Sequence, residues 1–260
     1  EKMSLEEART FWSFQPLQAV APPQDTTDHW SRTSLDAFVH SELKKHELSP
    51  VADADRRTLI RRATFDLTGL PPAPEEIDAF LRDEAADAFE AVVDRLLKSP
   101  AYGERWGRHW LDVARYADTA GDGADYPVRE AGKYRNWVID AFNHDQPFNE
   151  FIREQIAGDI LALNGPAEKY ADRVTATGFL AIGKRYGYKP SPDYQYLDFG
   201  DAIDSVGRSL LGLSLGCARC HDHKYDPVSA ADYYALYGIM ESTQWAFPGA
   251  EKFHPDKQIH

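Results

Sequence analysis

The chain has 260 residues, of which 43% are hydrophobic and 12% aromatic, so it can bury the core of one large domain or two small ones. A formal charge of −13 at pH 7 repels phosphate at long range, which excludes bulk electrostatic binding to nucleic acid or an anionic membrane surface. No stretch approaches the roughly 20 apolar residues of a membrane span. We therefore expect no nucleic-acid partner and no membrane-spanning segment.

The first 33 residues predict an extended lead-in or linker. Residues 16–33 are rich in proline and polar side chains and show no periodicity, which is typical of irregular structure. The N-terminal end also lacks the charged, apolar and small-residue regions of a secretion signal. We expect the chain to belong to a longer protein, so the missing signal does not indicate the cytoplasm.

Helical signals dominate over residues 34–245, which we expect to form one domain before a tail at 246–260. Ser34 suits a helix N-cap before apolar residues spaced three and four apart, and Pro74 suits the first turn of a later helix. No run of period two competes with these patterns, so the predicted fold class is all-α. Helices are expected from about residues 34, 53, 74 and 87, and at 101–116, 134–143, 148–161, 170–182, 194–214 and 229–242.

The segment GCARCHDHKYDP, residues 216–227, contains both cysteines of the chain. Cys217, Cys220 and His221 form a C-x-x-C-H pattern, in which two thiols bond covalently to the vinyl groups of haem and the histidine ligates the iron. Two intervening residues let both sulfurs face one porphyrin edge. The pattern predicts one covalent haem c with His221 as the proximal ligand, in an irregular multi-helix domain built around this haem.

Two other interpretations of the cysteines stay open. A thioredoxin-like dithiol requires C-x-x-C at a helix start in a strand-containing unit, and no strand is predicted before Cys217. A structural zinc ion requires four ligands in a tetrahedron. The candidates from Cys217 to His223 lie within seven residues, so a zinc-binding structural module would need a distant pair such as His254 and His260.

The sequence contains four long segments that are typical of one family: ADRRTLIRRATFDLTGLPPAPEEIDAFL, YGERWGRHWLDVARYADT, YRNWVIDAFNHDQPFNEFIREQIAGDIL and LLGLSLGCARCHDHKYDPVSAADYYAL. They resemble the planctomycete cytochrome-like domain family over about residues 11–245. Members occur in large multidomain proteins beside a cytochrome c domain and a further domain of unknown function. The resemblance implies haem c, a location outside the cytoplasm, where haem is attached to such chains, and a redox partner protein or neighbouring cytochrome c domain.

The second axial ligand of the iron has several candidates. His109 lies on a predicted helix where Trp106 and Trp110 are spaced to form an apolar wall against haem, and as a ligand it requires a partner for its other ring nitrogen. Met240 offers a thioether of the kind used by cytochromes c, although most such methionines are core residues. An open sixth position is the remaining alternative, and it would allow chemistry with peroxide or oxygen.

Three further residues are assigned to the surroundings of the haem. His223 is too close to His221 to reach the opposite face, so we expect it at the haem edge or behind the proximal ligand. Arg115 follows Asp112 at a spacing typical of a structural ion pair. If its helix faces the haem, Arg115 can neutralise a propionate and Asp118 can move protons, which makes these two residues the candidate catalytic groups.

These expectations lead to one function and one alternative of another class. The first is a monohaem c-type cytochrome-like domain that transfers electrons within or to a larger oxidoreductase outside the cytoplasm. The alternative is a haem-dependent peroxidase-like or oxygenase-like enzyme acting on an extracellular substrate, conceivably a carbohydrate. Its basis is size: an electron-transfer cytochrome c needs about 100 residues, whereas this domain devotes about twice as many to one haem.

Overall fold

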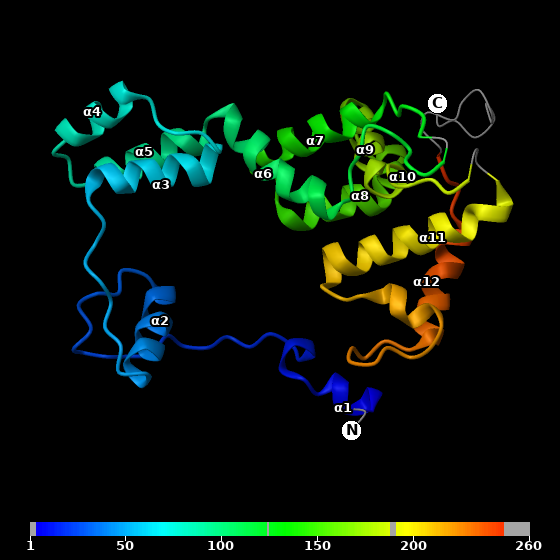
Figure 1. The fold of residues 1–260 in the computed structure, drawn as a ribbon, viewed down its shortest axis with the longest axis horizontal. Helices are drawn as coiled ribbons and strands as arrows, with labels where there is room; N and C mark the ends of the chain where they lie inside the picture. Colours follow the sequence, from blue (N-terminus) through cyan, green and yellow to red (C-terminus); the bar gives the residue numbers. More distant parts are fainter. Residues whose placement is uncertain (1–3, 124, 188–190, 247–260) are drawn as a thin grey trace.

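The computed structural model describes residues 4–123, 125–187 and 191–246, and every regular element in these ranges is helical (Figure 1). The all-α prediction is therefore confirmed. An isolated β-bridge joins Thr119 to Pro127 outside any strand. The α-helices are α1 (Leu5–Arg9), α2 (Ser34–Lys45), α3 (Arg56–Thr68), α4 (Pro74–Arg82), α5 (Ala88–Leu97), α6 (Pro100–Val113), α7 (Ala131–Asn143), α8 (Phe148–Leu163), α9 (Tyr170–Ala176), α10 (Gly178–Ala181), α11 (Pro192–Val206) and α12 (Ala230–Ser242). The short turns are the 3₁₀ elements η1 (Trp12–Phe14), η2 (Ala167–Lys169) and η4 (Leu215–Arg219) and the π-helical η3 (Gly207–Leu211).

Helices α3, α4 and α5 form a small unit with its own apolar core. Gly69 ends α3 in the left-handed conformation, with φ of 75°, and Pro74 begins α4, as expected for residues that stop and start helices. We call the core of this unit the N-terminal core cluster. It consists of Ile60, Phe80, Ala88, Val92 and Leu96.

Helices α6 to α10 surround the largest core, which we call the central core cluster. Its members include Trp110, Tyr134, Val138, Phe151 and Phe179. The crossing of α6 and α7 is close because of a glycine on α6: a Cβ at Gly103 would lie 2.4 Å from the backbone oxygen of Ile139. A side chain at this position would therefore push the two helices apart.

A second close crossing bends α8. A Cβ at Gly158 would lie 2.0 Å from the backbone oxygen of Arg173 on α9, so only glycine fits. The residue before it, Ala157, has non-helical torsion angles, φ −139° and ψ 30°, and the helix is kinked there. The Arg173 side chain pairs with Glu154 at 3.3 Å and donates to the Leu161 carbonyl at 2.7 Å, so it holds α9 against both sides of the kink.

Helices α11 and α12 and the turn η4 enclose the C-terminal core cluster. Its buried members are Phe199, Ala202, Ile203, Leu215, Ala218, Val228, Tyr233, Met240 and Trp245. Three partly buried residues, Tyr126, Leu180 and Val206, pack against both this cluster and the central core cluster. The two cores are thus in contact, and α11 and α12 lie beside the central helices (Figure 1).

The lead-in contains α1 and η1 and leads to α2, which stands apart from the other helices (Figure 1). Thr33, and not the predicted Ser34, caps α2, because its side chain accepts from the Asp36 backbone N–H while the Asp36 carboxylate accepts from Thr33. No residue of α2 is buried. The apolar face expected on this helix includes Phe38 and Val39. These two residues are 36% and 50% exposed.

Two expected helices are each divided into two elements. The segment 170–182 divides at Thr177, whose hydroxyl and backbone N–H both donate to the carbonyl of Val174, and the chain continues as the short α10. The segment 194–214 is α11 up to Val206 and then the π turn η3, which ends at Gly212 with φ of 66°. A glycine in the left-handed conformation terminates this turn as it terminates an α-helix.

Candidate functional site

The C-x-x-C-H segment comprises the turn η4 and the residues that follow it. Leu215 and Ala218 are 3% and 0% exposed and belong to the C-terminal core cluster. Cys217 lies within this turn, and Cys220 is the residue that follows its last position, Arg219. Both cysteines are exposed, and neither is in a disulfide. The turn therefore buries its apolar residues and leaves both cysteines exposed to solvent.

His221 follows directly and is exposed. Its Nδ1 lies 2.7 Å from the backbone oxygen of Asp222. Because a carbonyl oxygen only accepts, Nδ1 carries the proton and Nε2 carries the free lone pair. Metal-binding histidines use this arrangement, with one ring nitrogen donating to a carbonyl and the other available to the metal. His221 is thus in the tautomer that suits an Nε2 ligand.

His223 is buried and uses both ring nitrogens within the protein. Nδ1 accepts from the backbone N–H groups of Tyr225 and Asp226, at 3.2 and 2.7 Å, and Nε2 lies 3.1 Å from the hydroxyl of Ser214. With Nδ1 accepting, the proton is on Nε2, which donates to Ser214. His223 was predicted at the haem edge or behind the proximal ligand, and its position closes the loop that carries His221.

An ion pair on the adjacent helix holds the start of the turn. Asp204 on α11 accepts from the Gly216 backbone N–H at 3.2 Å, and its other oxygen accepts from Arg208 Nε at 2.6 Å. Arg208 is 65% exposed in its side chain, so the pair alone stabilises little. Its consequence is geometric, because the bond from Asp204 orients the residue directly before Cys217.

Helix α12 covers the other side of the turn. The hydroxyl of Tyr234 donates to the Arg219 carbonyl at 3.1 Å, and the Ala230 N–H donates to the Asp222 carboxylate at 2.9 Å. Met240, the predicted alternative thioether ligand, is 9% exposed and lies in the C-terminal core cluster. The structure therefore places Met240 in the core beneath the turn.

The residues predicted on α6 pack elsewhere. Helix α6 packs against α3 and α7, whereas η4 packs against α11 and α12. Trp106 donates to the Asp66 carbonyl at 3.1 Å, and His109 is exposed with its ring 5.4 Å from that of Trp106. Trp110 is buried and donates to Gln155 at 2.8 Å. The described packing joins these residues to α3 and to the central core cluster and does not place them around the cysteine turn.

Arg115 connects three segments of the chain. Its Nε donates to Asp201 on α11 at 2.5 Å, and Nη1 donates to the Phe179 carbonyl at 3.2 Å. The guanidinium also lies against Gly183, where a Cβ would be 2.8 Å from Nη2. Arg115 was predicted to be a catalytic residue. In the structure these contacts use its side chain to hold together the segments where the two core clusters meet.

Asp118, the other predicted catalytic residue, accepts from the hydroxyl of Tyr116 at 2.5 Å. Asp118 is exposed. Partial burial, together with the neighbouring carboxylate, raises the pKa of Tyr116 to about 12. The proton between these two groups therefore stays on the phenol at neutral pH.

A buried charged pair that was not predicted from the sequence lies near Arg115. Arg185 and Asp198 are 7% and 5% exposed. Burial lowers the pKa of Arg185 and raises that of Asp198, and the two opposite charges counteract each shift. Asp198 also accepts from the Tyr186 backbone N–H at 3.2 Å. The sequence signal is the spacing of Asp198 and Asp201 on α11, which puts two acids on one helix face beside apolar residues.

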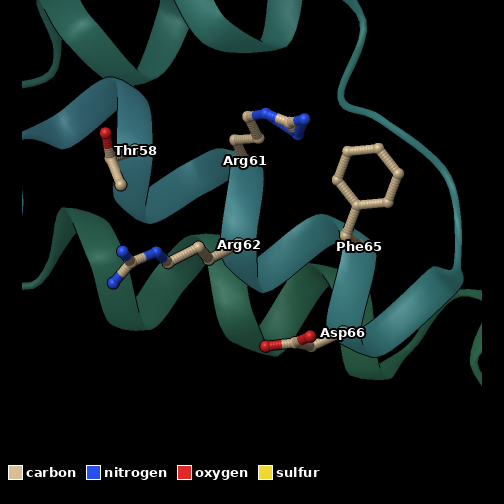
Figure 2. Close-up of a pocket in the computed structure, with 5 residues that line it drawn as sticks. All are labelled: Thr58, Arg61, Arg62, Phe65 and Asp66. Atoms are coloured by element: carbon tan, nitrogen blue, oxygen red, sulfur yellow. The ribbon is translucent and has the colours of Figure 1, made fainter.

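Two surface hollows lie in the α3–α5 unit, away from the cysteine turn. Figure 2 shows the first, on α3, with Arg61 directed toward the ring of Phe65; the guanidinium carbon is 4.7 Å from the ring centroid. Its other lining residues are Thr58, Arg62 and Asp66, all from the same helix. The second lies between α4 and α5. Neither hollow contains a residue of the C-x-x-C-H segment.

Within the described ranges, no three His, Cys, Asp or Glu side chains are arranged to hold a metal ion. The predicted zinc set was to be completed by His254 and His260, which lie outside the described residues. In the same ranges, no helix has the length and apolarity needed to cross a membrane.

A family model named PSCyt2, described as a protein of unknown function (DUF1549), matches residues 34–245. The chain belongs to the PSCyt2 family. The match confirms the family that the sequence segments resemble, and the PSCyt2 name denotes a cytochrome-like domain. Searches of curated proteins and of solved structures gave no match. In this PSCyt2 domain the C-x-x-C-H turn and both helices that cover it lie inside the matched range.

Proposed function

We propose that this PSCyt2 domain is a monohaem c-type cytochrome-like domain that transfers electrons within or to a larger oxidoreductase outside the cytoplasm. One observation carries the proposal: two free, exposed cysteines lie three residues apart at a short turn, and the next residue is a histidine with an available Nε2. When bound, haem supplies a centre that takes up and releases one electron.

The residues fit the roles that haem c attachment requires. The thiols of Cys217 and Cys220 would each hold one vinyl group of haem through a thioether, formed by addition of S–H across the double bond with no leaving group. His221 would offer Nε2 to the iron, and the Asp222 carbonyl holds the ring orientation through Nδ1. The Asp204 bond to Gly216 fixes the turn before the first thiol.

The surroundings of the turn favour a carrier. His221 and both cysteines are exposed, so a redox partner protein or a neighbouring cytochrome c domain can approach the haem edge. The candidate catalytic residues Arg115 and Asp118 are instead engaged with Asp201 and Tyr116. A location outside the cytoplasm is part of the proposal, because covalent haem attachment takes place there.

The test is expression of the chain with an export signal beside a cytochrome c maturation system. We expect a Soret band, a mass increase of one haem, and haem that stays with the protein in acidified acetone. Cys217→Ser and Cys220→Ser should each leave one thioether, seen as a haemochrome band at longer wavelength, and the double variant should leave none.

His221→Ala should remove normal iron ligation. The matched control is His46→Ala, at the exposed C-cap of α2, which should keep the wild-type spectrum. Haem that is absent or extractable overturns the proposal. A zinc ion retained through Cys217 and Cys220 would indicate a structural module instead. Binding of cyanide to the oxidised protein, with turnover of peroxide, would replace the carrier by the haem enzyme.

A further inference from the structure

Helix α8 has apolar side chains on its outer face as well as on its inner face. The inner face packs against α9 and α10 and contains the buried Phe151 and Ala162. On the outer face, the exposed fractions of Phe148, Ile156, Ile160 and Leu163 are 62%, 40%, 59% and 76%. The outer face of a solvated helix is normally polar, and a helix that is apolar all round is covered on every side. The outer face of α8 thus has the composition of a covered surface.

The apolar residues of this face form one continuous row. Phe148, Ile152, Ile156 and Ile160 follow one another at intervals of four residues, and Leu163 comes three residues later. We call these five residues the α8 ridge. Side chains four residues apart form a ridge on a helix surface, with a groove beside it. The ridge extends over the full length of α8.

The area of the α8 ridge is large for a surface left in solvent. At roughly 200 Å² for each large apolar residue, the exposed fractions correspond to about 500 Å² of apolar surface. A patch of this size is as large as the largest one on most monomeric proteins, and such patches often mark an interaction site. Two such ridges packed together would bury about 1,000 Å², which reaches the area that a biological interface needs.

The charge around the α8 ridge also suits a second copy of the chain. Each copy has a formal charge of −13, so two acidic faces would repel each other. The ridge itself carries no charge. Beside it, Arg153 pairs with Glu150 at 3.0 Å, and Asp159 adds one further acid. The ridge is therefore a nearly uncharged part of an acidic chain, where repulsion between two copies is weakest.

We propose that the α8 ridge is the interface between two copies of this chain, related by a two-fold axis. A two-fold interface uses the same patch on both subunits, and the ridges of two helices that both repeat every four residues pack into each other's grooves at a crossing angle of about −50°. Helix α8 packs against α9 and α10, whereas η4 packs against α11 and α12. Pairing through α8 thus does not use the helices that cover the cysteine turn, and it does not depend on haem.

Sedimentation equilibrium of the full chain tests the proposal. At about 100 µM protein, above the micromolar dissociation constants of weak interfaces, we expect the mass of a dimer. Ile160→Glu places an unpaired charge in the interface and should raise the dissociation constant by at least about 100-fold. The matched control is Ile239→Glu on α12, because Ile239 is also 59% exposed; this variant should remain a dimer. Circular dichroism checks the fold of each variant.

A cysteine cross-link tests which face is used. In the Cys217→Ser, Cys220→Ser background, Ile156→Cys in the middle of the ridge should form a disulfide between two copies on oxidation, because residues close to a two-fold axis meet their own copies. Ile239→Cys in the same background should give no such product. The inference is overturned by a wild type that stays monomeric at this concentration, by an Ile160→Glu variant that stays dimeric, or by cross-linking that is equal at both positions.

Discussion

Arg115 and Asp201 are 86 residues apart in the chain, and the Nε of Arg115 donates to Oδ2 of Asp201 at 2.5 Å. Arg115 adopts a left-handed backbone conformation, with φ of 55°, which is unfavourable for any residue with a Cβ. The ion pair and the bond to the Phe179 carbonyl offset this cost. The pair joins the end of α6 to α11 and so links the central helices to the helices that carry the cysteine turn.

Arg115→Ala should lower the free energy of unfolding by about 2 kcal/mol, because it leaves the Asp201 carboxylate without its charged donor. Arg115→Gly removes the same contacts and also relieves the backbone conformation, so it should be about 1 kcal/mol more stable than the alanine variant. Urea unfolding monitored by tryptophan fluorescence measures both. Equal stability of the two variants would contradict the role assigned to the left-handed residue.

Gly158→Ala should destabilise the protein by about 3 kcal/mol, since the added Cβ meets the backbone oxygen of Arg173 and the helices must move apart. Gly238 in α12 is the matched control, because a Cβ there meets no heavy atom within 4 Å. Gly238→Ala should stabilise α12 by up to about 1 kcal/mol. Urea unfolding of both variants tests the pair, and a mild effect at Gly158 would argue against the close crossing of α8 and α9.

Tyr116 should make stability depend on pH in the alkaline range. Its pKa is raised from 10.0 to about 12 in the folded protein, so the folded state keeps the proton that the unfolded state releases. The resulting stability is fully present below about pH 10 and is lost as the pH rises toward about 12. Urea unfolding from pH 9 upward measures this. The free energy of unfolding of the wild type should exceed that of Tyr116→Phe by less and less over this interval, and a constant difference between the two free energies would contradict the raised pKa.

His223→Ala should lower the free energy of unfolding by about 1 to 2 kcal/mol, because it leaves the partly buried N–H groups of Tyr225 and Asp226 without their acceptor. If His223 acts only by closing the loop, the variant with attached haem should keep the spectrum of the wild type. Thermal unfolding and the visible spectrum of the same sample separate the two properties. A changed iron spin state would instead assign His223 to the iron.

Local sequence signals predict the helical elements and the composition of the cysteine turn. Pro74 and Pro100 begin helices α4 and α6, and Gly69 ends α3, because these residues restrict or extend backbone torsion angles wherever they occur. The C-x-x-C-H pattern is equally local, since three residues within five positions set its chemistry. Such signals act over one or two helical turns and can be recognised without a partner segment.

Long-range packing sets which residues surround the turn and which ones stabilise the fold. His109 has suitable chemistry, but the partners of α6 are α3 and α7. Arg115 acquires its role from Asp201, 86 residues along the chain, and Asp198 acquires its role from the loop that precedes α11. The apolar spacing of α2 predicts a buried face, and the structure leaves that helix with no buried residue. Periodicity specifies which residues of a helix lie together, whereas long-range packing specifies what, if anything, they face.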